Sequence, residues 1–170
     1  MNKNLKYLKP YLIAEIGINH NGSISIAKKM MDVAKANGFD AVKFQKRDPE
    51  ICVPENQKKI FRETPWGVIT YLAYKKKIEF NFKQFAILKK YAKKLKLDFC
   101  ASCFDTNSLK LMSKLNDFNK IPSAMITNTT LLEQEAKKRK KTFISTGMCT
   151  MSNISNAIKI FKKNKCDFEL

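Results

Sequence analysis

Histidine, arginine and tryptophan are scarce in this chain of 170 residues, which has one histidine, three arginines and one tryptophan. No apolar run approaches the roughly 20 residues that a membrane-spanning helix needs, and this excludes a transmembrane protein. Residues 1–10 hold lysines but neither an apolar core segment nor a small-residue cleavage site, so we expect no secretory signal. The cytoplasm is therefore the expected compartment.

Paired cysteines and nucleotide-binding motifs are also lacking. The five cysteines are odd in number and scattered, which does not fit a disulfide framework, so we expect reduced thiols. The pair Cys100 and Cys103 has no second cysteine pair and no clustered histidine beside it, which argues against a zinc or redox site. No Walker motif or GxGxxG motif is present, so the sequence gives no support for nucleotide binding.

Negative charge is in short supply, with 15 acidic residues against 33 basic ones and a formal net charge of +18. Such a surplus attracts nucleic acid, anionic surfaces and phosphorylated substrates alike. Nearly all the basic residues are lysines, which lack the planar fork that favours base and phosphate recognition. A non-catalytic, basic nucleic-acid-binding domain is thus an alternative, but nucleic acid is not the expected partner.

Short apolar runs alternate with amphipathic segments from residue 11 onward. The runs predict strands at residues 11–16, 41–45, 98–102, 120–122 and 142–145, with residues 167–170 opening a sixth. The amphipathic segments predict helices at residues 24–34, 81–95, 107–115, 129–138 and 151–163. Repeated βα units favour an α/β fold with a parallel sheet, either doubly wound or a barrel.

The segment between residues 46 and 80 is less regular. It contains three prolines and a glycine, and we interpret it as a long functional loop with a short helix near residues 56–62. Trp66 within it either covers a site or anchors the loop. The single histidine, His20, lies in a predicted loop without a nucleophile motif, so we expect it to hydrogen-bond its neighbours rather than to catalyse.

Polar side chains gather where the predicted strands end. They are Glu15, Lys43, Gln45, Ser102, Ser123 and Ser145. Ligands bind at the carboxyl edge of parallel strands in barrels and open sheets alike, and lysines with hydroxyls suit a phosphate. Glu15 lies in an apolar strand and needs a cationic partner, for which Lys43 is available. The alternative is a purely structural ion pair between Glu15 and Lys43, with the serines acting as helix caps.

Several of these residues lie in motifs that follow one another in order along nearly the whole chain. The motifs are Ile13-Ala14-Glu15-Ile16-Gly17-Ile18-Asn19-His20-Asn21-Gly22, Ala41-Val42-Lys43-Phe44-Gln45, Lys120-Ile121-Pro122-Ser123, Ile126-Thr127-Asn128 and Ser145-Thr146-Gly147-Met148. With these motifs the chain resembles the N-acetylneuraminate (sialic acid) synthase family, including its legionaminic and pseudaminic acid relatives.

The resemblance implies an incomplete TIM (β/α)8 barrel of about five βα units plus the start of a sixth strand. Residues 1–170 would then be the N-terminal part of the barrel, without the family's C-terminal antifreeze-like domain. The implied reaction condenses phosphoenolpyruvate with an N-acetylmannosamine-type sugar and releases phosphate. The chain would then be either a truncated synthase or one subunit of a split synthase, and its expected partner is a complementing C-terminal chain or a second copy in a homodimer. Without it, an open five-unit fragment is expected to have little activity of its own.

The resemblance also assigns roles to individual residues. It implies that Glu15 is the acid/base carboxylate, that Lys43 is the active-site lysine and that Gln45 contacts the sugar. The positions matched to phosphoenolpyruvate binding are Ser102, Lys120, Ser123 and Ser145. A divalent metal, Mn or Mg, is implied as well, but the family's metal-binding histidines lie on later strands that this chain lacks. The family's acidic pair after Ser123 is replaced here by Ala124-Met125.

Overall fold

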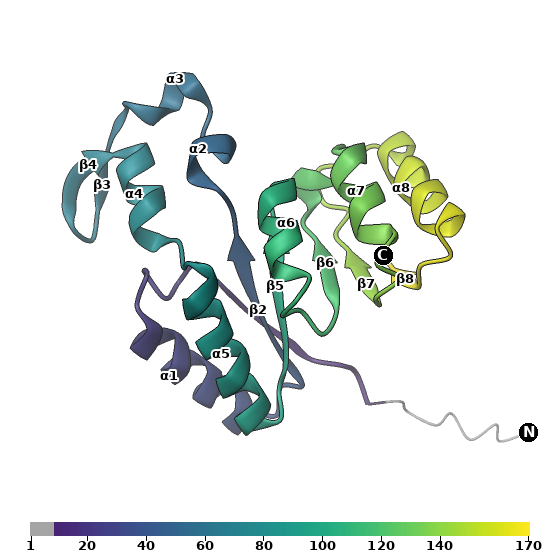
Figure 1. Ribbon diagram of the computed structural model, residues 1–170, viewed down its shortest axis with the longest axis horizontal. Helices are drawn as coiled ribbons and strands as arrows, with labels where there is room; N and C mark the ends of the chain where they lie inside the picture. The colour runs from purple at the N-terminus through teal and green to yellow at the C-terminus, as the bar shows by residue number, and fades with distance from the viewer. Residues whose placement is uncertain (1–8) are drawn as a thin grey trace, which may run out of the picture.

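Six parallel strands carry the fold of the computed structural model, which describes residues 9–170 (Figure 1). The strands β1 (Ile13–Gly17), β2 (Ala41–Lys46) and β5 (Asp98–Cys103) form one sheet in the order β1-β2-β5. A second parallel sheet, in the order β6-β7-β8, consists of β6 (Asn119–Ile121), β7 (Thr142–Ile144) and β8 (Phe168–Glu169). Strands β5 and β6 are neighbours, so the two sheets follow each other in one row.

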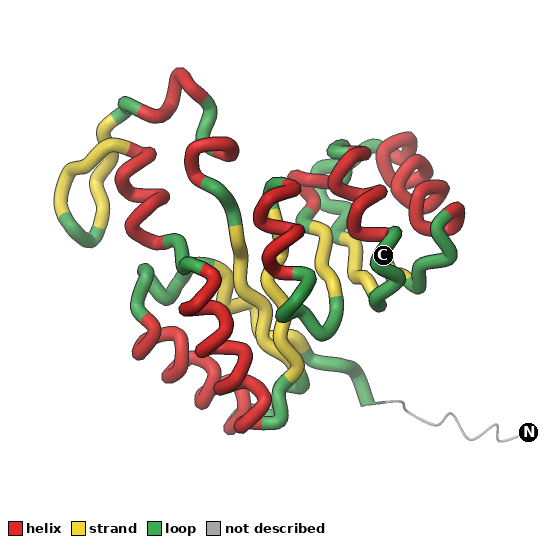
Figure 2. Tube along the Cα trace, viewed as in Figure 1, coloured by secondary structure: helices red, strands yellow, loops and turns green. Residues whose placement is uncertain are grey.

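Five helices each follow a strand of this row and return the chain to the next one. They are α1 (Ile24–Ala36), α5 (Phe82–Leu95), α6 (Thr106–Met112), α7 (Thr129–Ala136) and α8 (Met151–Lys163). In Figure 2 these helices lie on the outer side of the strands. The arrangement is five βα units followed by a sixth strand, and the predicted α/β class is confirmed. Local signals set the helix starts: the Ser23 side chain, for example, accepts a hydrogen bond from the amide of Ile26.

Apolar side chains form a cluster on each face of the sheet, as expected for parallel strands. Large buried side chains pack between the strands and the helices on the outer face, among them Phe44, Phe85, Phe99, Leu88 and Phe161. A smaller cluster packs on the opposite face and contains Ala41, Cys100 and Phe118, with Ile13 and Phe143 against it.

The row of strands is curved. Tyr11, which precedes β1, stacks on Phe143 of β7 with ring centroids 6.3 Å apart and meets Phe118 edge-on at 6.2 Å. Strands β1 and β7 are separated by three others in the row, so this contact requires the sheet to bend around the smaller cluster. The bend is that of a barrel wall and not of a flat, doubly wound sheet.

The segment between residues 46 and 80 is more ordered than the sequence predicted. The structure has two short helices, α2 (Pro49–Cys52) and α3 (Glu55–Lys58), then an antiparallel hairpin of β3 (Phe61–Thr64) and β4 (Gly67–Thr70), and the helix α4 (Tyr71–Ile78). The prediction of a long loop is therefore wrong, whereas the short helix predicted near residues 56–62 overlaps α3 in part. The Thr64 hydroxyl closes the hairpin turn by donating to the carbonyl of Gly67, and this residue is a local sequence signal for the turn.

Two other expectations concern this part of the chain and its beginning. The Trp66 ring lies near Tyr74, with centroids 6.3 Å apart, and under the ammonium of Lys77, so it anchors the hairpin on α4.

No helix within residues 9–170 is long and apolar enough to cross a membrane. The prediction that the first ten residues hold no secretory signal falls largely on residues 1–8, which lie outside the described residues.

Candidate active site

The first pair of predicted site residues faces each other across two neighbouring strands. Glu15 of β1 and Lys43 of β2 are register partners, and the Lys43 ammonium lies 2.6 Å from the Glu15 carboxylate. The pair is asymmetric, because the side chain of Lys43 is only 6% exposed whereas that of Glu15 is 59% exposed. A buried ammonium is therefore held at the site by a carboxylate that remains in contact with solvent.

A second lysine reaches the site from β6. The Lys120 ammonium donates to the hydroxyl of Ser145, just after β7, and to the Ile121 carbonyl at 3.2 Å. Burial lowers the pKa of Lys120, and the positive charge of Lys43 lowers it further. The carboxylate of Glu15 opposes this lowering, and a bound anion would favour the charged form of Lys120 in the same way.

Ser102 and Gln45 lie nearer to the carboxyl ends of their strands than Lys43 does. They are register partners on β5 and β2. The Ser102 hydroxyl is buried and has no hydrogen-bond partner among the described residues, which leaves its donor free for a ligand. The Gln45 amide contacts the guanidinium of Arg47, and its Nε2 lies 3.6 Å from where a Cβ on Gly17 would sit.

Ser123 and Ser145 come together through the loops that follow β6 and β7. Ser123 begins a short 3-10 turn, η1 (Ser123–Met125), directly after Pro122. Its hydroxyl lies 3.9 Å from where a Cβ on Gly147 would sit, so the loop containing Ser145 and Gly147 passes beside it. The six strand-end positions singled out in the sequence thus lie at the ends of adjacent strands, around the concave side of the sheet.

The floor below these polar groups is apolar. Side chains alternate along each strand, so the residues two positions before Glu15, Lys43 and Lys120 point the same way. These are Ile13, Ala41 and Phe118, all members of the inner cluster. An adjoining cavity of about 300 Å³ is lined by residues of β1, β6, β7 and β8, including Lys120, Ser145 and Glu169. The concave face therefore presents two cations and several hydroxyls next to an apolar inner cluster.

Three charged residues near the site were not found by the sequence analysis. Lys46 is the last residue of β2 and Arg47 follows it. Both contact the buried Glu79 carboxylate at 3.2 Å. Burial raises the pKa of Glu79 against the opposing effect of these two cations. Arg47 also lies over the ring of Phe104 and contacts Gln45, so this network fixes the end of β2. In the sequence, only the small number of arginines made Arg47 stand out.

His20 has the structural role that the sequence predicted. It is buried, stacks on Phe80 with ring centroids 4.0 Å apart, and accepts a hydrogen bond from the amide of Gly22 through Nδ1. Burial lowers its pKa to about 4, so the ring is neutral at physiological pH. His20 anchors the loop between β1 and α1.

The two cysteines of β5 lie on opposite faces of the strand, because their spacing of three reverses the side-chain direction. Cys100 belongs to the inner cluster and Cys103 to the outer one, and burial raises the pKa of both thiols. They do not form a redox pair.

Metal ligands do not converge among the described residues. Within residues 9–170, no group of three or more His, Cys, Asp or Glu side chains could hold a metal ion. The residues present therefore do not fit the divalent cation that the resemblance implies.

A curved parallel βα sheet with cations and hydroxyls at its strand ends defines a barrel-type protein whose polar groups gather at the carboxyl ends of the strands. The comparisons with known proteins agree, because the model of the NeuB family matches residues 30–168. The chain belongs to the NeuB family.

Curated relatives cover nearly all of this chain. The N,N'-diacetyllegionaminic acid synthase of Campylobacter jejuni is 36% identical over 163 residues, which are 92% of this chain and 48% of the relative. The N-acetylneuraminate-9-phosphate synthase of Drosophila melanogaster is 37% identical over 164 residues, or 94% of this chain and 44% of the relative. The chain thus spans about half the length of the curated relatives that it matches.

Solved structures show the same relationship. The N-acetylneuraminic acid (sialic acid) synthetase of Leptospira borgpetersenii, in complex with citrate, is 31% identical and superposes with a TM-score of 0.83. That match covers 98% of this chain and 56% of the solved chain. A truncated 3-deoxy-D-arabino-heptulosonate 7-phosphate synthase of Thermotoga maritima, at 11% identity and a TM-score of 0.65, shares the fold alone.

Proposed function

We propose that this chain forms the phosphoenolpyruvate-binding part of a synthase that condenses phosphoenolpyruvate with an N-acetylmannosamine-type sugar to give a nonulosonic acid. The observation that carries the proposal is the convergence of Lys43 and Lys120, both shielded from solvent, with hydroxyls at the ends of adjacent strands. The relatives named as legionaminic and neuraminate synthases support this reading. Citrate, which is bound in the Leptospira structure, is like phosphoenolpyruvate a small anion with several negative charges.

Each group at the rim has a chemical task in this reaction. The ammonium groups of Lys43 and Lys120 bind the carboxylate and phosphate of phosphoenolpyruvate. The hydroxyls of Ser102, Ser123 and Ser145 donate hydrogen bonds to the same oxygens, and Gln45 contacts the sugar. Burial strengthens these charge-assisted contacts because few water molecules compete with them.

The chemistry then follows from the substrate. The terminal enol carbon of phosphoenolpyruvate attacks the sugar aldehyde and forms a C–C bond, while the aldehyde oxygen takes up a proton. Water adds to the central carbon of the enolpyruvate unit, and one of its protons balances the proton taken up by the aldehyde oxygen. The remaining hydroxyl group becomes the keto group as the C–O bond breaks, and its proton leaves with the inorganic phosphate. Glu15 moves the proton, because its exposed carboxylate lies 2.6 Å from the Lys43 ammonium and can exchange protons with solvent.

The setting of the reaction belongs to the same proposal. We place the ligands of the implied Mn or Mg ion outside residues 9–170. The remaining βα units are likewise placed outside residues 9–170, and the partner we propose is either a chain that carries these units or a second copy of this chain. The five cysteines are free, which supports a reducing compartment such as the cytoplasm. A non-catalytic nucleic-acid-binding role is the weaker candidate, because it leaves the polar strand ends without a purpose.

Calorimetric titration with phosphoenolpyruvate tests the proposal. We expect the chain to bind one equivalent, and Lys43→Met or Lys120→Met to weaken binding by at least about tenfold, since each removes a charge-assisted contact. Lys159→Met is the matched control, because Lys159 is exposed on α8 and should leave binding unchanged. The chain alone should release little or no phosphate from phosphoenolpyruvate and N-acetylmannosamine. Binding that ignored both site variants would refute the assignment of the site.

A further inference from the structure

The side-chain amide of Gln45 is held at its oxygen and free at its nitrogen. The oxygen Oε1 accepts a hydrogen bond from Nη2 of Arg47, two residues further along the chain. The nitrogen Nε2 lies at the end of β1, 3.6 Å from where a Cβ on Gly17 would sit. Within residues 9–170 no group accepts a hydrogen bond from this nitrogen. The two N–H groups of Gln45 are therefore available to a ligand.

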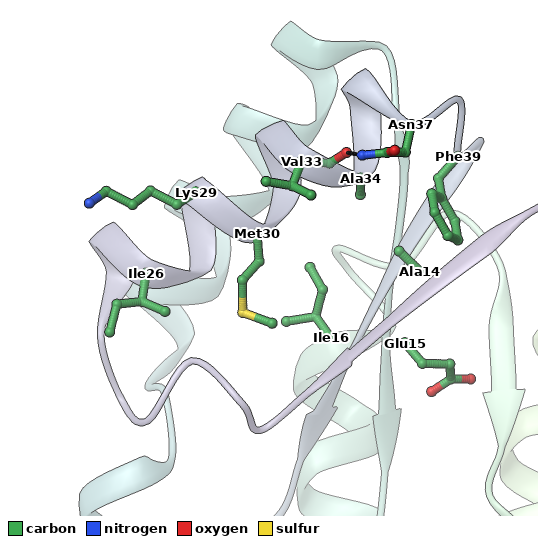
Figure 3. A pocket seen from close by; sticks show the side chains of 10 residues that line it. All are labelled: Ala14, Glu15, Ile16, Ile26, Lys29, Met30, Val33, Ala34, Asn37 and Phe39. Carbon is green, nitrogen blue, oxygen red and sulfur yellow. Dashed lines mark hydrogen bonds between the residues drawn. The ribbon is translucent and has the colours of Figure 1, made fainter.

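The end of β1 that Nε2 approaches belongs to the candidate active site. Gly17 comes two residues after Glu15, and Figure 3 shows the Glu15 side chain pointing away from α1. Gln45 comes two residues after Lys43 on β2, and side chains two apart on a strand point the same way. The free N–H groups thus lie on the face of the sheet that carries the Glu15–Lys43 pair.

The chemistry of the guanidinium group decides which end of the amide faces the site. A guanidinium has five N–H donors and no acceptor, so only the oxygen of an amide can face it favourably. If the Gln45 amide were turned by half a rotation, its NH2 group would meet the donors of Arg47. The contact therefore selects one of two amide orientations and leaves a pair of donors, without an acceptor, at the site.

Arg47 is itself held by several contacts. Its Nε lies 3.2 Å from Oε1 of the buried Glu79 carboxylate, and its backbone N–H donates to Oε2 at 3.3 Å. The guanidinium carbon lies 4.5 Å from the centroid of the Phe104 ring, which covers one of its faces. The side chain of Arg47 is only 11% exposed. Because the guanidinium has few other positions to occupy, it keeps the amide oxygen of Gln45 in one place.

The contact between Arg47 and Gln45 is not needed to fasten residues 46–80 to the sheet. The Lys46 ammonium and the backbone N–H of Arg47 already tie the Glu79 carboxylate to the end of β2. Gln45 and Arg47 are two residues apart, so a bond between their side chains joins no distant parts of the chain. What this bond fixes is the orientation of the Gln45 amide.

We infer that Arg47 is a positioning residue for the sugar: it holds the Gln45 amide so that Gln45 acts only as a hydrogen-bond donor, to an oxygen atom of the sugar. The inference rests on the proposed function, in which Gln45 contacts the sugar. Without Arg47 the amide would rotate about its side-chain bonds and would present its donors to the site only part of the time. The apparent affinity for the sugar would fall in proportion to that fraction.

Nuclear magnetic resonance of the isotopically labelled, full 170-residue chain tests the inference. Gln45→Met identifies the side-chain amide signals of Gln45 by their loss. We expect nuclear Overhauser effects between these amide protons and the α protons of Gly17 in the unaltered chain. Arg47→Met should abolish these effects, because the amide oxygen loses its partner.

The same samples, saturated with phosphoenolpyruvate, are then titrated with N-acetylmannosamine, and binding is followed at the backbone amide of Gly17. In the unaltered chain the Gln45 side-chain signals should shift as the sugar is added. Arg47→Met should weaken sugar binding roughly three- to tenfold, because the donors are in place for a smaller fraction of the time. Gln45→Glu keeps a partner for Arg47 but has no N–H donor, so it should weaken binding at least as much.

Lys46→Met is the matched control. It removes a cation from the same Glu79 carboxylate, so it should lower the melting temperature as Arg47→Met does, but the Lys46 side chain does not contact Gln45. Lys46→Met should therefore keep the Overhauser effects and the sugar affinity of the unaltered chain.

Three results would overturn the inference. One is survival of the Overhauser effects and of sugar affinity in Arg47→Met, and another is an equal loss of both in Arg47→Met and Lys46→Met, as expected of a merely structural network. The third is sugar addition that leaves the Gln45 amide signals unmoved. Calorimetric titration with phosphoenolpyruvate is scored separately, because its failure in the unaltered chain would count against the proposed function. The Overhauser effects need no ligand and would still report whether Arg47 holds the amide.

Discussion

Lys43 and Glu15 show how single residues prepare the rim for an anion. The Lys43 ammonium is buried while the Glu15 carboxylate is exposed. The carboxylate can therefore turn away into solvent while the ammonium stays buried. The sequence allowed this pair to be predicted, because an acidic residue within an apolar strand requires a cation nearby. It could not reveal that the two groups differ in burial, which depends on how the sheet curves.

Replacement of Glu15 by glutamine tests this asymmetry. The carboxylate competes with an incoming anion for Lys43, so Glu15→Gln should tighten phosphoenolpyruvate binding by a factor of roughly three to ten. Calorimetric titration measures the change, with Glu133→Gln on the exposed face of α7 as the control. Weaker binding by Glu15→Gln would show that the carboxylate helps to hold the ligand.

A second residue, Glu135 of α7, makes the stability of the chain depend on pH. Burial raises the pKa of Glu135 to about 7, against the attraction of Lys138 at 3.6 Å. The folded chain therefore binds a proton that the unfolded chain loses above about pH 4.5, and stability falls as pH rises from there to 7.

Glu135→Gln should remove this loss. Relative to the unaltered chain, the variant should gain up to about 3 kcal/mol of unfolding free energy between pH 4.5 and pH 7, as measured by urea denaturation. His20 acts in the opposite direction, because its lowered pKa reduces stability as pH falls from 6.5 toward 4. The difference between the variant and the parent isolates Glu135 from this effect. If the variant and the parent differed in unfolding free energy by the same amount at pH 4.5 and at pH 7, the assigned burial of the Glu135 carboxylate would be contradicted.

At the scale of elements, the loop after β1 is tied to the end of α4. Gly22 has φ of +72°, and a Cβ there would lie 2.4 Å from the carbonyl oxygen of Lys77. The loop that carries His20 is thereby held against the chain that leads from α4 to α5. This close approach positions the irregular segment between β2 and α5 relative to β1.

Gly22→Ala should lower the unfolding free energy by at least about 2 kcal/mol, because strain from the positive φ adds to the clash with Lys77. Gly38→Ala is the control for φ alone, since Gly38 has φ of +77° but nothing within 4 Å of its missing Cβ. The control should cost about 1 kcal/mol. Equal losses in the two variants, measured by chemical denaturation, would show that the contact with Lys77 does not constrain the fold.

Most elements could be predicted from periodicity, and the exceptions have physical reasons. The strands and helices of the five βα units follow from apolar runs and amphipathic spacing, with ends shifted by a few residues. The hairpin of β3 and β4 could not, because its strands are mostly exposed and lack the buried alternation on which such predictions depend. Arg47 and Glu79 escaped notice because contacts 32 residues apart leave no local pattern.

At the scale of the whole molecule, curvature turns a row of strands into a site. The ring contacts of Tyr11 with Phe118 and Phe143 bring the start of β1 toward β6 and β7. The same bend lets Glu15 and Lys43 share a rim with Lys120 and Ser145, whose strands are not their neighbours. Residues could be assigned to strand ends from the sequence, whereas their convergence depends on this bend.

The most direct test of the central claim is a crystal structure of the chain with phosphoenolpyruvate. The account predicts electron density for the ligand on the concave face, with its anionic groups within hydrogen-bond distance of both Lys43 and Lys120. Density for phosphoenolpyruvate among the exposed lysines of the helices, with the two strand lysines uncontacted, would contradict it.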